Sequence, residues 1–182
     1  MDPKPHKLTI QQPTLTTARL TLRPFTRLDL VTMIDRGFYG DVDPAQAAHF
    51  AFVTARSYQT RLQEGQAVHF VVERSLDAAL LGEVALVLDL EGSQAELGYE
   101  IGPQHRGQGY ATEAAVEVVR YGFEVLRLDR IQATTSAANL ASIRVLEKVG
   151  TVYGSRHTAE GRGEVRYTFH QTTRADSPQQ RQ

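Results

Sequence analysis

The residues best suited to chemistry lie in one short segment, Gln104–Gly109 (QHRGQG), between an apolar run and a long amphipathic stretch. Its glycines, Gly107 and Gly109, permit a positive φ or the close approach of a ligand to the backbone. A strand that enters a helix through such a turn leaves unpaired N–H groups at the positive end of the helix dipole, which favours phosphate. Arg106 adds a fixed positive charge with forked donors. The segment therefore predicts an anion-binding turn, with a tight turn that binds nothing as the alternative.

Two other phosphate-binding motifs fit this segment poorly. A Walker loop needs GxxxxGK[ST], and the chain has no such lysine. A dinucleotide fingerprint needs GxGxxG, whereas Ala111 and Thr112 follow Gly109 and no early βαβ unit surrounds them. The pattern that remains is QxxGxG after an antiparallel strand, and a nucleotide-binding protein is a weak alternative.

The flanking sequence predicts the elements that must position this turn. Before it, three apolar runs separated by turn-like segments predict an antiparallel meander over residues 67–74, 80–88 and 94–102. After it, apolar residues at helical spacing predict a helix over residues 106–126. The turn should therefore join the last strand of the meander to this helix.

Further strands and a second helix follow the first one. A strand is predicted over residues 130–136, and a helix over 139–149 that ends at Gly150. Additional strands are expected near Val152 and over residues 164–170.

The N-terminal part begins with a strand and continues with helices. A half-buried strand over residues 18–25 stops at Pro24. Asp29 is expected to cap a short helix over residues 30–36, and another helix runs from Pro44 to about Glu64. The whole order predicts an α+β fold with a mixed sheet.

Length and composition favour one ordinary globular domain. A chain of 182 residues with 41% hydrophobic residues can bury a core, and its net charge of −1 argues against nucleic-acid or membrane-surface partners. There is no cysteine, which removes disulfides and cysteine-ligated zinc. No apolar run approaches about 18–20 residues and no signal peptide is visible, so we expect a cytoplasmic protein. We expect a flexible lead-in over residues 1–13, one domain over 14–172 and a flexible tail over 173–182.

Histidine spacing gives no sign of a metal site. No HxH or HExxH pattern connects the histidines at the positions His49, His69, His105 and His157. Zinc is therefore not expected.

Three further segments occur in order around the turn: RLTLRPF with Asp29, AELGYEIGP followed by GQGYATEA, and NLASIRVLEKVG. Together with QxxGxG they resemble the GNAT acetyltransferase superfamily over roughly residues 18–150. The sequences of these segments are most similar to the branch of RimJ and RimL, ribosomal-protein N-terminal acetyltransferases. The resemblance implies a single-domain GNAT fold, with a mixed, mostly antiparallel sheet flanked by helices and central strands splayed around coenzyme A.

The same resemblance implies acetyl-coenzyme A as cosubstrate and no metal. Ile101 and Gly102 would offer backbone groups to the pantetheine arm, and a backbone N–H of their strand would polarise the thioester carbonyl. Asn139 would contact pantetheine as well, with a plain N-cap as its equal alternative. The pyrophosphate would be held by Arg106, Gly107, Gln108, Gly109, Tyr110 and Ala111.

The resemblance is incomplete where a proton donor is expected. Many relatives carry a tyrosine at the position of Leu146, proposed to protonate the departing thiolate, and leucine cannot do this. Ser142 matches a serine of the RimL-like branch and would donate a proton or hydrogen bond to the sulfur. A hydroxyl bonded back within the first turn of the helix is the alternative for Ser142. The aromatic residue that follows the terminal glycine in relatives is replaced by Thr151.

Three strand carboxylates, Glu96, Glu100 and Glu83, are candidates for a general base. Glu96 matches the catalytic glutamate position of some lysine-acetylating relatives. Glu96 and Glu100 share a face if their strand is regular, whereas a bulge would separate them. A solvent-facing Glu96 without a catalytic role is the alternative.

These residues predict an N-acetyltransferase whose amine acceptor attacks directly in a ternary complex. Because no carboxylate is strongly specified as a base, we expect an acceptor amine with a pKa below about 9, such as a protein N-terminal α-amine. A small-molecule acetyltransferase of aminoglycoside or polyamine type and a non-catalytic acyl-coenzyme A sensor remain alternatives. A homodimer is left open, because many relatives dimerise. Aromatic residues in the region where relatives build their acceptor pocket, with core packing as the alternative, are Phe38, Tyr39, Phe50 and Phe52.

Overall fold

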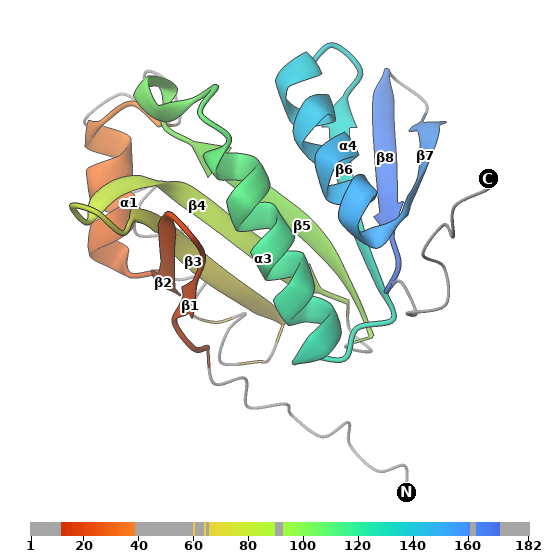
Figure 1. The fold of residues 1–182 in the computed structure, drawn as a ribbon, viewed down its shortest axis with the longest axis horizontal. Helices are drawn as coiled ribbons and strands as arrows, with labels where there is room; N and C mark the ends of the chain where they lie inside the picture. The colour runs from red at the N-terminus through yellow and green to blue at the C-terminus, as the bar shows by residue number, and fades with distance from the viewer. Residues whose placement is uncertain are drawn as a thin grey trace, which may run out of the picture.

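The computed structural model describes residues 12–38, 60, 64, 66–89, 93–160 and 163–171. These form an α+β domain around one eight-stranded sheet with the order β1-β2-β3-β4-β5-β6-β8-β7 (Figure 1). The strands are β1 Leu15–Thr16, β2 Leu20–Pro24, β3 Ala67–Arg74, β4 Ala79–Leu88, β5 Gln94–Ile101, β6 Arg130–Ser136, β7 Ser155–Glu160 and β8 Glu164–Phe169. The helices are α1 Arg27–Asp35, α3 Tyr110–Glu124 and α4 Leu140–Tyr153, with a 3₁₀ turn η1 at Pro103–His105.

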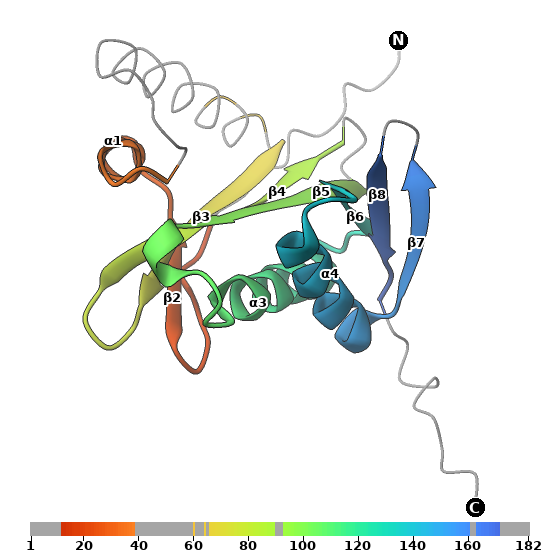
Figure 2. The same ribbon diagram turned by 90° about the horizontal axis from the view of Figure 1, so that it is seen from above.

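The sheet separates the helices into two layers. Figure 2 shows α3 and α4 on one face and α1 on the other. Alternating side chains of β2 and β4 that point toward α3, such as Leu22 and Leu86, are buried against its apolar side at Ala115 and Val118. The opposite face holds a smaller apolar cluster beneath α1, formed by Met33, Phe38, Val71 and Leu80 with Phe25 beside it.

The central strands diverge after a short paired region. β5 pairs with β6 in parallel at three positions, Gln94 with Arg130, Ala95 with Ile131 and Glu96 with Gln132. Beyond them β5 continues to Ile101 and β6 to Ser136, while β6 stays paired with β8. Figure 1 shows the two strands separating toward η1 and the start of α4. The predicted splay of the central strands is therefore confirmed.

The predicted meander and mixed sheet are confirmed, with β3, β4 and β5 antiparallel. The pairing of β4 with β5 is regular, whereas the register of β3 with β4 shifts between Val72 and Glu73. The strand predicted over residues 130–136 has the same limits as β6. A two-residue strand, β1, was not predicted, and its pairing with β2 gives the first residues of the domain a place in the sheet. The helix predicted from Pro44 to Glu64 lies almost entirely outside the described residues.

Several predicted helix limits are wrong. The helix after the anion-binding turn starts at Tyr110 rather than residue 106, because η1 and the turn come first. The second signature helix continues past Gly150 to Tyr153, so no strand starts near Val152. A β-carbon at Gly150 would lie 2.2 Å from the Ser155 hydroxyl oxygen, so this glycine permits close packing of α4 on β7 and does not end the helix.

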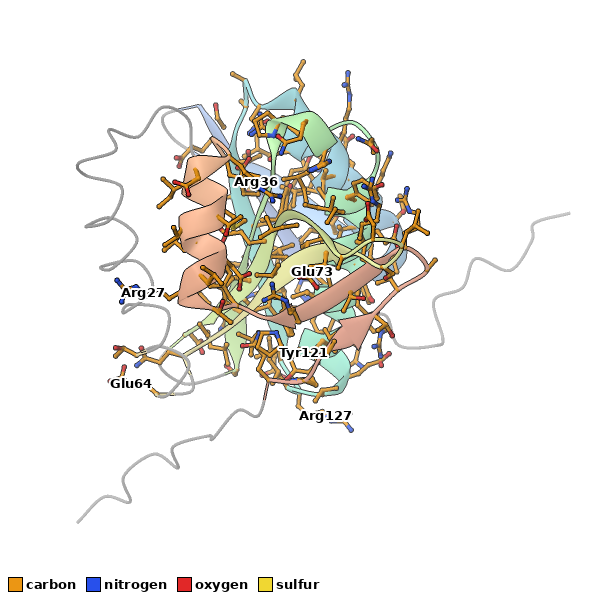
Figure 3. All side chains as sticks on the ribbon, turned by 90° about the vertical axis from the view of Figure 1, so that its left-hand side faces the viewer. Arg27, Arg36, Glu64, Glu73, Tyr121 and Arg127 are labelled. Atoms are coloured by element: carbon orange, nitrogen blue, oxygen red, sulfur yellow. The ribbon has the colours of Figure 1, made fainter. Side chains whose placement is uncertain are left out.

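The first helix is capped three residues earlier than predicted. Thr26 is its N-cap, and Asp29 completes a capping box by accepting a hydrogen bond from the Thr26 backbone N–H. Asp29 also accepts two hydrogen bonds from the guanidinium of Arg23, at 2.6 and 2.8 Å. Arg23 donates to Glu73 of β3 as well, on the face seen in Figure 3. The start of α1 is therefore fixed to the sheet by charge.

Candidate active site

A pocket of about 430 Å³ lies at the open end of the splay. It is formed by the end of β5, the turn before α3, and the first turns of α3 and α4. The lining residues are Tyr99–Ile101, His105–Gly107, Gly109–Thr112, Asn139, Ala141, Ser142, Arg144, Val145 and Lys148. The structure thus brings the two segments singled out in the sequence, 104–111 and 139–142, to one site.

The glycines of the turn have the backbone conformation that their sequence positions predicted. Gly107 and Gly109 have φ values of +76° and +83°, in the left-handed region that side chains disfavour. Gly109 is the N-cap of α3, and no side chain caps this helix. The first N–H groups of α3 therefore face the pocket side without a side-chain acceptor, the usual state of a helix N-terminus that binds an anion.

The lining carries more positive than negative charge. Arg106, Arg144 and Lys148 contribute cations, and Glu100 contributes the one carboxylate among the described lining residues. Glu100 forms an ion pair with Arg106 at 2.6 Å. The positive charges of Arg144 and Lys148 on α4 therefore have no carboxylate partner among the described lining residues. Such a set suits a multiply charged anion near the start of α3.

Arg106 is positioned differently from its predicted role. Its Nε donates to the Ile101 carbonyl at 2.8 Å while its terminal nitrogen binds Glu100. The guanidinium therefore lies back along β5, although it is more than half exposed. To give its full charge to a phosphate, it would have to release Glu100.

The backbone of Ile101 and Gly102 is also engaged. The Ile101 carbonyl is the acceptor for Arg106, and the Gly102 N–H donates to Leu81 of β4 at 2.9 Å. The Gly102 carbonyl accepts from the His105 N–H at 2.8 Å. The N–H and the carbonyl of Gly102 and the carbonyl of Ile101 thus already have partners within the protein, and the prediction that Ile101 and Gly102 offer backbone groups to a ligand stays a prediction.

The start of α4 supplies polar groups to the other wall. The Asn139 side chain accepts from the Ser142 N–H at 3.1 Å, so its N-cap role is confirmed. No hydrogen bond of the Ser142 hydroxyl is found among the described residues, so this hydroxyl is not bonded back into the first turn. Leu146 is 1% exposed and packs in the core, away from the pocket lining.

Tyr99 connects the two walls of the splay and was not singled out from the sequence. Its hydroxyl donates to the Ser142 carbonyl at 3.2 Å, from β5 to α4. Burial raises the pKa of Tyr99, so the hydroxyl keeps its proton at neutral pH. The alternation of AELGYEI places Tyr99 on the face opposite Glu96, which is the signal that could have identified it.

The three candidate carboxylates occupy one face of the sheet. β5 is in regular register with β4 from Gly82 to Leu88, so Glu96 and Glu100 share a face, and Glu100 pairs across the strands with Glu83. Glu96 is exposed, lies in the part of β5 that pairs with β6, and is outside the pocket lining. The regular-strand alternative is therefore correct.

Glu83 is buried against a histidine. Its carboxylate lies 2.8 Å from His69 Nε2, and the Phe25 ring stacks on the imidazole with a centroid distance of 4.0 Å. Of the three carboxylates, Glu83 is thus engaged with His69, Glu100 with Arg106, and Glu96 faces open space. Phe38 packs in the cluster beneath α1, whereas Tyr39, Phe50 and Phe52 lie outside the described residues.

Neither a metal centre nor a membrane span is found in the part of the chain that the structure describes. No group of three or more potential ligands gathers there. None of the described helices is long and apolar enough to cross a bilayer.

Comparisons with known proteins agree with this geometry. The acetyltransferase (GNAT) domain family matches residues 19–152. The chain is 32% identical over 146 residues to the uncharacterized N-acetyltransferase YoaA of Bacillus subtilis, covering 76% of this chain and 82% of YoaA.

Other relatives match over about half of each chain. The probable N-acetyltransferase YjcK of Bacillus subtilis is 41% identical, over 51% of this chain and 52% of its own. Spermidine N(1)-acetyltransferase of Escherichia coli is 30% identical, over 51% of this chain and 50% of its own.

Solved structures share the fold. A putative ribosomal-protein-serine acetyltransferase from Vibrio cholerae superimposes with a TM-score of 0.69 at 21% identity, over 86% of this chain and 97% of that one. The family match, the shared fold and the splayed strands beside an uncapped helix N-terminus lead to one conclusion: the chain belongs to the GNAT acetyltransferase family and is an acetyl-coenzyme A-dependent N-acetyltransferase.

Proposed function

We propose that the chain acetylates an amine of modest basicity, a protein N-terminal α-amine or a small-molecule amine, by direct attack on acetyl-coenzyme A. The observation that carries the proposal is the cation-lined pocket at the uncapped start of α3, beside the end of β5 that no longer pairs with β6. A diphosphate needs backbone N–H groups and positive charge, and a pantetheine arm needs a strand edge. The residues present supply both.

The turn and the first residues of α3 would hold the pyrophosphate. Gly107 to Ala111 present a left-handed turn and the uncapped N–H groups, and Arg144 and Lys148 add charge from α4. Arg106 takes part in this set only after releasing Glu100. The predicted diphosphate contact of Arg106 therefore requires a change of its side chain on binding.

The end of β5 and the start of α4 would hold the pantetheine arm and the thioester. A backbone N–H of β5 would stabilise negative charge on the carbonyl oxygen during attack. Ser142 is in the pocket lining, and its hydroxyl is available to donate to the departing sulfur. Asn139 fixes the position of Ser142 through the N-cap hydrogen bond.

Proton removal from the acceptor would take place on the carboxylate face of β4 and β5. Glu96 is the exposed carboxylate of this face, and Glu83 with His69 forms a buried pair two strands from β6. An amine with a pKa near 7.8 is already about one quarter neutral near pH 7.4, so an open-faced Glu96 would suffice as base, with water as relay. A lysine side chain near 10.4 would need much stronger assistance.

The sequence resemblance to the RimJ/RimL branch favours a protein N-terminus as acceptor. A ribosomal-protein N-terminus is therefore the first substrate to test. The second candidate is a polyamine. Glu96 is the exposed carboxylate on the face that it shares with Glu83 and Glu100, and its charge would attract a cationic acceptor. A partial match to spermidine N(1)-acetyltransferase supports the same candidate.

A panel of acceptors tests the proposal. Release of free coenzyme A is followed with peptides bearing free or acetylated N-termini, spermidine and an aminoglycoside, from pH 6 to pH 9. We expect turnover with free N-termini and little with peptides whose only amines are lysine side chains. Turnover with spermidine instead would favour the second candidate and would require a stronger base than an open-faced Glu96. Turnover confined to internal lysines would contradict the acceptor hypothesis. Tight coenzyme A binding with no turnover on this panel would contradict both acceptor candidates and point to an amine of another class.

A further inference from the structure

Arg19, in the connection between β1 and β2, contacts the anion-binding turn at Gln108 and Tyr110. Its NH1 donates to the Gln108 carbonyl at 3.1 Å. Its guanidinium carbon lies 4.7 Å from the centre of the Tyr110 ring, in a cation–π arrangement. A terminal nitrogen lies 3.5 Å from the place where a β-carbon on Gly109 would be. The side chain thus touches both neighbours of the positive-φ glycine and borders the glycine itself.

The same arginine binds a carboxylate in the first turn of α3. Its Nε donates to Glu113 at 2.7 Å and its backbone N–H donates to the other carboxylate oxygen at 2.9 Å. The Thr17 hydroxyl donates to that oxygen as well, at 2.6 Å. Burial opposes ionisation of Glu113, but these hydrogen bonds outweigh it and hold its pKa below the ordinary value.

A carboxylate at this place raises an electrostatic question. Anionic side chains near a helix N-terminus interact with the same N–H groups and dipole that would bind a diphosphate. Glu113 would therefore compete with and repel the ligand if it were free. Paired with Arg19 and Thr17, its charge is compensated and its oxygens are engaged.

We propose that Arg19 is a positioning residue for coenzyme A: it holds Gln108–Tyr110 in the anion-binding conformation and compensates the Glu113 carboxylate beside it. This inference rests on the proposed diphosphate role of the turn. It adds a residue from a distant strand connection to the residues that determine affinity for the nucleotide part of the cosubstrate. The acceptor and the acetyl group are not involved.

The proposal separates two parts of acetyl-coenzyme A. Arg19→Gln should raise the Kd for acetyl-coenzyme A about tenfold and raise its KM, with kcat nearly unchanged. The KM for S-acetylpantetheine, which lacks the diphosphate, should not change. Arg19→Lys should fall between wild type and Arg19→Gln, because lysine keeps the charge but lacks the fork that reaches Glu113 and Gln108 together.

A second substitution distinguishes charge compensation from general support of the fold. In Arg19→Gln/Glu113→Gln the uncompensated carboxylate is gone, so we expect the Kd to recover to within about threefold of the wild-type value, since only the support of the turn is still missing. Arg120→Gln is the matched control, since Arg120 lies on α3 and forms ion pairs with Glu117 and Glu124 beyond the turn. It should leave the Kd unchanged.

Calorimetric titration of each folded variant with acetyl-coenzyme A measures these Kd values and tests the role of Arg19. An unchanged Kd in Arg19→Gln, or a double variant that binds as weakly as Arg19→Gln, would overturn the proposal. Equal losses for acetyl-coenzyme A and S-acetylpantetheine would overturn it as well, because they indicate a general distortion. A wild-type protein without affinity for coenzyme A would contradict the proposed function itself, which is a different result.

Discussion

The two faces of the sheet bury different kinds of residue. The face under α3 and α4 is packed with apolar side chains from β2 to β6 and from both helices. The described residues include three buried polar or charged ones, Asp29, His69 and Glu83, and all three belong to the α1 side. The two faces therefore have different roles in our proposal: the apolar core on one face supports the proposed coenzyme site, and the other face holds the buried ionisable groups.

This division makes separable predictions. Changes on the α3 and α4 side should alter coenzyme A binding or the departure of its thiolate, without altering pH dependence. Changes on the α1 side should alter the pH dependence of activity or stability, with coenzyme A affinity preserved.

The largest effect is expected at the anion-binding turn. Gly109→Val places a β-branched residue at a φ of +83°, so the turn must change conformation. A strain of about 1–3 kcal/mol corresponds to roughly a five- to 150-fold weaker affinity for acetyl-coenzyme A. Calorimetry on the folded variant measures this loss.

Gly37→Val is the matched control for that variant. Gly37 also has a positive φ, of +68°, but follows α1 on the other side of the sheet. It should lower thermal stability and leave the affinity intact. Equal affinity loss in both variants would break the comparison between the faces.

A smaller effect is expected on the carboxylate face. Glu96→Gln should lower kcat/KM about tenfold with an α-amine acceptor, less than the usual 10²–10⁴-fold of a general base, because such an amine is already partly neutral. In the pH profile of kcat/KM, the acidic limb of this variant should move toward the pKa of the acceptor amine. The measurement is the pH profile of kcat/KM.

Glu83→Gln gives the contrasting case on the same face. A shift of the profile in this variant, and none in Glu96→Gln, would transfer the role of base to the buried pair with His69. Coenzyme A affinity should stay at the wild-type value in both.

At the wall formed by α4, Ser142→Ala should lower kcat by several fold, with little change in KM. The effect is small because a thiolate departs readily even without a proton donor. Single-turnover kinetics at saturating cosubstrate measure it. A kcat within about a factor of two of wild type would leave Ser142 as a wall residue only, and Ala141→Ser on the same helix turn serves as a control for packing.

The last effect concerns the stability of the α1 side and not its activity. The hydrogen bonds from Arg23 and Thr26 outweigh the burial of Asp29 and hold its pKa below the ordinary value of about 3.9. Its contribution to stability is therefore present above the unfolded-state pKa and is lost as the pH falls through the folded-state pKa. Asp29→Asn should lower the free energy of unfolding by about 1–3 kcal/mol at pH 7 and by much less near pH 2.

Urea denaturation at the two pH values checks this expectation. Asp77→Asn is the control, because Asp77 forms an exposed ion pair with Arg74 that should contribute little. An Asp29→Asn loss of equal size at both pH values would show that shape, and not charge, accounts for it.

The sequence allowed the architecture to be predicted where local patterns determine it. Alternation and turn residues located β3, β4, β5 and β6, and the glycine pair at 107 and 109 indicated the left-handed turn. The limit of α4 was missed because a glycine that ends many helices here permits contact with Ser155. Arg19 and Glu113 are 94 positions apart, so no spacing rule connects them.

The direction of side chains was the other limit of sequence reasoning. Arg106 has the charge expected of a phosphate ligand, yet its guanidinium binds Glu100 and the Ile101 carbonyl. Tyr99 received no role because its contact with Ser142 exists only once β5 and α4 come together. The direction of a side chain depends on the residues that the fold places beside it, and these are not adjacent in the sequence.

The short parallel seam between β5 and β6 has a mechanical consequence. Three residue pairs join the part of the sheet that carries α1 and α3 to the part that carries α4. The Tyr99 hydroxyl adds a hydrogen bond from β5 to α4, and the Tyr153 hydroxyl adds one from α4 to α3. A molecule seated in the splay therefore bridges two halves that share little sheet structure. Its binding energy also resists their separation, so cosubstrate should raise the melting temperature with concentration and suppress hydrogen exchange along β6 more than along β3.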